Sequence, residues 1–185
     1  MDSKSQQAGN KVASGLRIED LRTDVVELSP EDFEDRYGSA FLLLSSTGFK
    51  QSKSATSTEV LLLDPGEVAG DRTAGVSVQV IPIRAAENSH THLITVGRTS
   101  QNDVSMADIS VSRLHAYFKR TKEGAFQLHD AGSTNGTIVN DVSVCTKETG
   151  PPTDVKSGDS IRFGQIDVTF LEVEALRSYV VKFGD

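Results

Sequence analysis

Three short groups of polar residues carry the side chains that binding a phosphate group requires. They are Gly97-Arg98, Ser112-Arg113-Leu114-His115 and Ser133-Thr134-Asn135-Gly136-Thr137. Proteins hold a phosphate with a guanidinium that forms two parallel hydrogen bonds, with hydroxyl groups, and with backbone N–H groups in a concave turn. All three kinds of donor occur here, so the segment is a candidate phosphate-binding site.

Each group also has a simpler interpretation when it is taken alone. Arg98 can form a surface ion pair with Asp103 or Asp108, and Ser112 can be an ordinary turn residue. The pair Asn135-Gly136 is typical of a tight turn. The phosphate hypothesis therefore depends on the three groups meeting in space.

Short apolar stretches separate the groups and must position them. Residues 93–96 predict a strand that ends at Arg98, residues 116–118 begin a strand after Ser112, and Phe126 and Leu128 alternate toward Asp130. The polar groups consequently follow or precede strands and lie on connecting loops, where binding residues are concentrated.

In this order, the groups resemble the pattern of the forkhead-associated (FHA) domain family. That pattern is Gly-Arg, then an acidic and aliphatic spacer, Ser-Arg-x-His-Ala, and Asp-x-x-Ser-Thr-Asn-Gly-Thr. The resemblance covers about residues 76–173. It implies an all-β fold, an antiparallel β-sandwich of about eleven strands, whose loops at one end bind phosphothreonine peptides.

The resemblance also assigns roles by position. The residues expected to bind the phosphopeptide are Arg98, Ser112, Arg113, Thr134 and Asn135. The residues expected to support the site are Gly97, His115 and Gly136. Possible specificity residues on the surrounding loops are Ser110, Asn140 and Gln165.

Two departures from the family pattern affect the loops beside the site. The family usually has Asn-Gly where this chain has Asn140-Asp141, so Asp141 must adopt a left-handed backbone that glycine tolerates better. Residues 145–156 are also longer than the usual connection. Neither departure changes a residue that is expected to contact phosphate.

The charge distribution favours one local anion site. The chain has 19 basic and 26 acidic residues and a net charge of −7, which argues against nucleic acid or an anionic membrane as the main partner. Residues 97–122 are the exception, with five basic and two acidic side chains. The alternative is that Lys119, Arg120 and Lys122 only decorate a solvated hairpin.

The sequence indicates a cytoplasmic protein that needs no cofactor. Cys145 is the only cysteine, the first residues lack the apolar core that a signal peptide needs, and no apolar run is long enough to span a bilayer. His90 and His92 have a spacing that can chelate a metal, but no second cluster accompanies them, so we expect loop residues and no metal site. The expected partner is a phosphothreonine protein, a Ser/Thr kinase or its substrate, in a bacterial signalling system.

The chain divides into three parts on composition. Residues 1–20 predict a disordered tail, residues 21–75 an N-terminal extension, and residues 76–185 the FHA-like domain with a C-terminal helix. The extension contains apolar runs at 40–44 and 60–63, both expected to be strands that pack on the core. A turn-rich stretch from Asp64 to Thr73 marks the boundary.

Three further elements follow from local signals. Ser29 and Pro30 predict the start of a short helix that Gly38 ends. Apolar residues spaced by three and four after Val173 predict a terminal helix that covers a sheet face or an edge of the sandwich. Around Val80 and Ile81 the apolar alternation changes phase, which predicts a bulge on an edge strand.

Two other functions are alternatives to phosphopeptide binding. Ser112, His115 and Asp130 supply the residue types of a hydrolase triad, but the chain has neither a nucleophile-elbow motif nor a phosphate loop, so we expect no enzyme. The stronger alternative is a scaffold that binds a partner, or itself, without phosphate. A scaffold explains the long N-terminal lead-in, but it does not explain why Arg98, Ser112 and Thr134 occur together.

Overall fold

The strands form two sheets, within residues 15–45, 78–85 and 93–183 that the computed structural model describes. The strands of the larger sheet are β1 (Leu16–Arg17), β2 (Ala40–Ser45), β3 (Val78–Pro82), β8 (Thr137–Val139), β9 (Val142–Ser143), β11 (Ser160–Phe163) and β12 (Ile166–Glu172). Those of the smaller sheet are β4 (Leu93–Gly97), β5 (Val104–Ser105), β6 (Ala116–Arg120), β7 (Phe126–Asp130) and β10 (Thr153–Val155).

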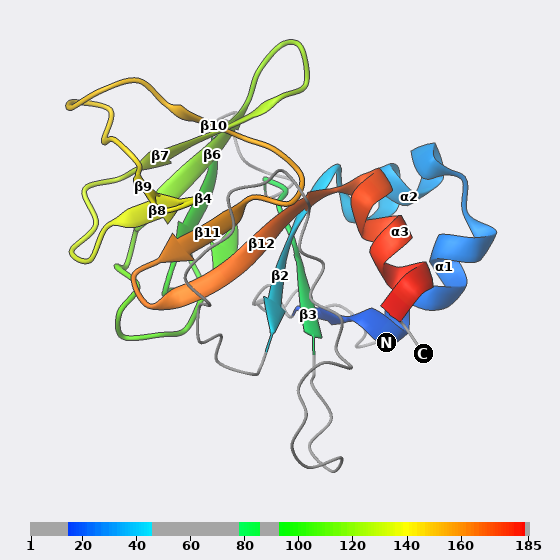
Figure 1. Cartoon of the computed structure of the whole chain (residues 1–185). Coiled ribbons are helices and arrows are strands. Elements are labelled where there is room, and N and C mark those ends of the chain that lie inside the picture. Colours follow the sequence, from blue (N-terminus) through cyan, green and yellow to red (C-terminus); the bar gives the residue numbers. More distant parts are fainter. Residues whose placement is uncertain (1–14, 46–77, 86–92, 184–185) are drawn as a thin grey trace, which may run out of the picture.

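The strand order confirms the expected β-sandwich. The larger sheet runs β1-β3-β2-β12-β11-β8-β9 and the smaller one β10-β7-β6-β4-β5. Neighbouring strands are antiparallel, except that β5 pairs with β4 in parallel. The helices η1 (Ile18–Leu21), α1 (Arg22–Glu27), α2 (Pro30–Tyr37) and α3 (Val173–Phe183) gather beside β2 and β3, on the side away from β8 and β9 (Figure 1).

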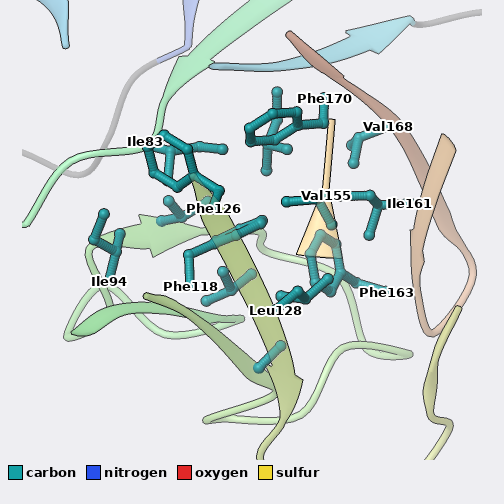
Figure 2. Close-up of a cluster of buried hydrophobic side chains, with 14 of the residues drawn as sticks. Ile83, Ile94, Phe118, Phe126, Leu128, Val155, Ile161, Phe163, Val168 and Phe170 are labelled. Carbon is teal, nitrogen blue, oxygen red and sulfur yellow. The ribbon is translucent and has the colours of Figure 1, made fainter. Parts of the chain in front are cut away.

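A core rich in phenylalanine joins the two sheets. Figure 2 shows side chains of both sheets pointing toward one another, among them Phe118 of β6 and Phe170 of β12. Their ring centroids lie 6.1 Å apart, and Phe126 meets Phe170 edge-on at 5.5 Å. Alternate residues of the strands face this core and fix the strands against one another. The loops that connect the strands are therefore held at the ends of the sandwich.

The larger sheet is buried on both of its faces near β2, β3 and β12. Ile81 and Leu42 belong to the core between the sheets, whereas their neighbours Val80 and Phe41 belong to a second core under the helices. A strand that is covered on both faces needs no alternation of polar residues. The predicted bulge at Val80 and Ile81 is therefore wrong, since β3 pairs with β2 in an uninterrupted register from Val78 to Pro82.

Both predicted helices are confirmed. Ser29 caps α2 by accepting a hydrogen bond from the Asp32 N–H at 3.1 Å, and Gly38 ends the helix with a φ of 104°. The terminal helix is α3, whose Leu176 belongs to the second core together with Phe33 of α2. The helices thus cover the outer face of the larger sheet.

The N-terminal part of the chain is more structured than its composition indicated. Residues 16–21, which the sequence placed largely in a disordered tail, form β1 and η1. Ile18 and Leu21 are buried in the second core, and Leu16 pairs with Val80. This segment has few apolar residues, but they are buried against the larger sheet and the helices, and this burial offsets the entropy lost when the segment becomes ordered.

Some predictions lie outside the described residues. They concern the tail up to residue 14, the apolar run at 60–63, the turn-rich boundary from Asp64 to Thr73, and the loop histidines His90 and His92. None of the helices in the described part is long and apolar enough to cross a membrane.

The second core gives a stability prediction. Phe33 is fully buried. Its ring centroid lies 6.2 Å from that of Phe41 and 5.5 Å from the guanidinium carbon of Arg177. We expect Phe33→Ala to lower the free energy of unfolding by about 3–5 kcal/mol in chemical denaturation. The exposed Val26→Ala serves as the control, and an unchanged midpoint for Phe33→Ala would show that the helices do not pack on the sheet.

Candidate functional site

A close backbone approach brings the first two polar groups together. The Arg98 N–H donates to the Ser112 carbonyl at 3.0 Å, immediately after β4. A β-carbon on Gly97 would lie 2.2 Å from the Arg113 carbonyl oxygen, well inside contact distance. Only glycine fits there, so the expected supporting role of Gly97 has a steric cause.

The second and third groups meet through one hydroxyl. The Ser112 Oγ accepts a hydrogen bond from the Thr134 N–H at 3.0 Å and lies 3.4 Å from the Thr134 Oγ1. Ser112 and Thr134 are 22 positions apart in the chain, so this contact fixes the loop after β7 against the loop before β6. The two hydroxyls consequently lie side by side.

His115 braces both loops from inside the protein. Its ring is fully buried, and its Nδ1 accepts a hydrogen bond from the Ser112 N–H at 3.0 Å. The Nε2 therefore carries the proton and donates to the Gly136 carbonyl at 3.0 Å. Neither nitrogen is available to a ligand, which matches a structural histidine.

Asp130 organises the turn that carries Thr134. One carboxylate oxygen accepts from the N–H groups of Gly132 and Ser133, and the other accepts from the hydroxyls of Ser133 and Thr137. Burial acts to raise the pKa of Asp130, but these hydrogen bonds outweigh it and hold the pKa below its ordinary value of 3.8. The charged form thus stabilises the turn.

This pKa shift predicts a pH dependence. A carboxyl whose pKa is lower in the folded state stabilises the fold above its unfolded pKa, and this contribution is lost as the pH falls through the folded value. Asp130→Asn should therefore reduce the free energy of unfolding by about 1–3 kcal/mol at pH 7, because Asn keeps fewer acceptors. The deficit should shrink in denaturation below pH 3.8, and a deficit independent of pH would contradict the assignment.

Two arginines beside the hydroxyls have no anionic partner among the described residues. The side chains of Arg98 and Arg113 are exposed, and neither guanidinium forms a hydrogen bond or ion pair with a described residue. The rival ion pairs of Arg98 are not formed. Asp103 accepts from Thr95, and Asp108 accepts from the N–H and hydroxyl of Ser110.

These side chains surround an open depression of about 730 Å³. Its lining includes the predicted site residues Arg98, Ser110, Ser112, Arg113, Thr134 and Asn135. No aspartate or glutamate is among the described residues that line it. A concave surface with two free guanidinium groups, two hydroxyls and no carboxylate is suited to bind a small dianion.

The candidate specificity residues differ in position. Ser110 lines the depression, and its carbonyl accepts a hydrogen bond from the Asn135 side chain at 2.8 Å. Gln165 approaches Ser110 through its backbone N–H, which donates to the Ser110 hydroxyl at 3.0 Å. Asn140 bonds instead to Asp159 and Ser160, and it is not among the lining residues.

The departure at residues 140 and 141 has the expected local consequence. Asn140 and Asp141 have φ angles of 47° and 66°, so both adopt the left-handed backbone of a tight hairpin turn between β8 and β9. Asp141 thus tolerates the conformation that the family usually gives to glycine.

Sequence reasoning missed several residues that shape the site. The Asn102 side chain donates to the Arg113 carbonyl at 2.7 Å, and no local pattern distinguished it from other loop asparagines. The role of Asp130 had a signal, since an aspartate followed by Gly and Ser is typical of a turn capped by a side chain. Ile109 and Leu114, which line the depression, were not singled out.

The described residues offer no metal site. No group of three or more His, Cys, Asp or Glu side chains within them is placed to hold a metal ion.

The central part of the chain is similar in sequence to known proteins. Residues 94–164 match the family model of the FHA domain. An oxoglutarate dehydrogenase inhibitor of Corynebacterium diphtheriae is 37% identical over 78 residues, which are 42% of this chain and 50% of that protein. The glycogen accumulation regulator GarA of Mycolicibacterium smegmatis is 36% identical over 77 residues, 42% of this chain and 44% of that protein. The chain spans about half the length of the curated relatives it matches.

The solved structures that a structural comparison matched to this chain include FHA domains. One, from a structural and functional analysis of phosphothreonine-dependent FHA domain interactions, has a TM-score of 0.43 and 19% identity, covering 72% of this chain and 96% of its own. The FHA domain of the CT664 protein from Chlamydia trachomatis has a TM-score of 0.45 and 18% identity, covering 72% and 97%.

Proposed function

We propose that residues 94–164, which match the family model of the FHA domain, bind phosphothreonine segments of partner proteins in Ser/Thr kinase signalling. In this proposal the chain is an interaction module without catalysis of its own and without a cofactor. Its partner is a Ser/Thr kinase or a substrate of one.

The observation that carries the proposal is a pair of arginines, Arg98 and Arg113, that lie beside two hydroxyls and have no side-chain partner within the described part of the chain. Arg98 directly follows Gly97, whose backbone packs closely against Arg113. The Arg98 N–H donates to the Ser112 carbonyl, so the backbone of Arg98 is fixed beside Ser112. When such a guanidinium binds phosphate, the phosphate replaces water molecules and no protein hydrogen bond has to break. The planar arrangement of its N–H donors matches two phosphate oxygens. Arg113 adds charge, and Ser112 and Thr134 add hydroxyl donors.

Asn135 supports recognition of the peptide main chain in this proposal. Its side-chain nitrogen is held by the Ser110 carbonyl, whereas its amide oxygen has no partner among the described residues. A fixed amide at the edge of the depression is able to accept a hydrogen bond from a peptide N–H. In this proposal Asn135 binds the peptide main chain, and the arginines bind the phosphate group.

The relatives support a regulatory binding role. Those reported above are named an inhibitor and a regulator, and they come from bacteria. The free, half-buried thiol of Cys145 is compatible with a reducing compartment, which supports a cytoplasmic location within the proposal. We also retain as a proposal the division between an N-terminal extension up to residue 75 and a domain from residue 76, with β2 of the extension lying inside the larger sheet between β3 and β12.

The test is a binding screen with an oriented peptide library by fluorescence anisotropy. Three versions of the library contain phosphothreonine, phosphoserine or unmodified threonine at the fixed position. We expect binding of the phosphothreonine library, weaker binding of phosphoserine by about fourfold for one lost methyl group, and none of threonine. Equal binding of phosphorylated and plain peptides would instead favour the phosphate-independent scaffold.

A further inference from the structure

The side chain of Asn102 joins two of the loops that form the depression. Its Nδ2 donates to the Arg113 carbonyl at 2.7 Å, and it lies 3.0 Å from both the carbonyl oxygen and the hydroxyl of Thr99. If the amide were flipped, its oxygen would face two carbonyl oxygens, so the hydrogen bonds fix the orientation of the amide. The loop after β4 is thereby tied to the segment that carries Arg113.

Asn102 is itself held in place by the smaller sheet. Its backbone N–H closes a turn by donating to the Thr99 carbonyl at 3.1 Å. The next residue, Asp103, exchanges hydrogen bonds with Thr95 of β4. The Asp103 N–H donates to the Thr95 hydroxyl at 3.0 Å, and the Asp103 carboxylate accepts from the Thr95 N–H at 2.8 Å. The side-chain amide of Asn102 therefore projects from a fixed backbone.

The backbone of Arg113 has few other supports. On either side of it, Ser112 and His115 form backbone hydrogen bonds with residues 96–98 at the end of β4. Arg113 and the residue after it lie between these two points, and both are exposed. Within the described residues, the Arg113 carbonyl accepts the hydrogen bond from Asn102 and a longer one, at 3.4 Å, from a threonine hydroxyl of the same turn.

Gly97 leaves the space that this hydrogen bond needs. A β-carbon at position 97 would lie 2.7 Å from the Nδ2 of Asn102 and 2.2 Å from the carbonyl oxygen of Arg113. The donor and the acceptor therefore meet directly over Gly97, the residue that precedes Arg98.

From these contacts we propose that Asn102 is a positioning residue for Arg113. By holding the Arg113 carbonyl, it fixes the base of that side chain beside Arg98, so that both guanidinium groups reach one phosphate. The inference rests on the proposed function, because the spacing of the arginines matters only if they bind the phosphate together. An arginine whose backbone is already fixed loses less entropy when it binds, so this hydrogen bond contributes to affinity without itself touching the phosphate.

The test is a double-mutant cycle measured by isothermal titration, or by NMR titration where binding is weak. The probe is a phosphothreonine peptide with alanine at all flanking positions, and its unphosphorylated form is the negative control. We expect Asn102→Ala to weaken binding by about threefold to tenfold, the effect of one hydrogen bond. In a protein that already carries Arg113→Ala, the same substitution should change the affinity by less than about twofold, because no guanidinium remains to be positioned.

Thermal unfolding of the same samples separates positioning from general stability. Gln127→Ala is the matched control, since the Gln127 amide donates to Asp154 at 3.0 Å on the smaller sheet and Gln127 is not a lining residue. This control should bind as the unmodified protein does, whatever its own melting temperature. Should Asn102→Ala not fold, Asn102→Leu keeps the approximate size of the side chain without its donor and enters the same cycle.

Failure of this inference differs from failure of the proposed function. Phosphate-dependent binding that the Asn102 substitution leaves unchanged, or weakens equally with and without the Arg113 side chain, overturns the inference alone. Binding that does not depend on phosphate overturns the proposed function and the inference together.

Discussion

Replacing Arg98 with alanine should weaken binding of a phosphothreonine peptide by at least one to two orders of magnitude, and leave the fold intact. Each charge-assisted hydrogen bond contributes about 1.5–3 kcal/mol, and a guanidinium that grips two phosphate oxygens forms two of them. The guanidinium has no partner among the described residues, so its removal breaks no internal contact. The measurement is the Kd by isothermal titration, with thermal unfolding recorded for the same samples.

Two further substitutions sharpen this prediction. Arg98→Lys keeps the positive charge but loses the planar fork, and it should restore only part of the affinity. Arg17→Ala removes an arginine whose side chain is 70% exposed and which pairs with Asp20, away from the lining residues. It should bind as the unmodified protein does, and an equal loss in both alanine variants would point to a general charge effect.

Gly97→Ala should damage both stability and binding, because the new methyl group has no room. Its carbon would lie 2.2 Å from the Arg113 carbonyl oxygen and 2.9 Å from the carbonyl carbon. Backbone atoms cannot rotate away as a side chain does, so β4 must separate from the segment at residues 112–114. We expect a loss of about 1–3 kcal/mol in the free energy of unfolding, measured by chemical denaturation.

The binding consequence follows from the same separation. The bond from the Arg98 N–H to the Ser112 carbonyl would lengthen, and the guanidinium would move relative to the two hydroxyls. A displacement on the order of 1 Å at such a site costs about a hundredfold in function. Gly124→Ala is the control, since Gly124 has a φ of 90° in a hairpin and no crowded backbone neighbour. It should lose stability through backbone strain but keep its affinity.

Local patterns in the sequence predicted the elements around the site well. Alternating apolar residues placed β4, β6 and β7, and Ser29 with Pro30 placed the start of α2. The family pattern placed Arg98, Ser112 and Thr134 on loops that the structure brings together. These signals are short-range, so a single chain is enough to detect them.

What the sequence did not predict depends on long-range packing. The phase change at Val80 and Ile81 indicated a bulge, whereas β3 is covered on both faces. Val80 packs under the helices, and Ile81 packs in the core between the two sheets. The apolar residues near the start of the chain, among them Leu16 and Ile18, were too few for the sequence to predict a strand or a helix there. In the structure Leu16 pairs with β3, and Ile18 packs in the second core. Asn102 acquires its role from a carbonyl eleven positions away.

The central claim is that three separate loops form one cradle for a phosphate dianion. It is tested most directly by NMR titration of the labelled protein with a phosphothreonine peptide, following backbone amides and the Arg98 Nε–H. We predict the largest shifts at Arg98, Ser112 and Thr134, and none of that size with the unphosphorylated peptide. Shifts confined to another face, or equal shifts with both peptides, would contradict the account.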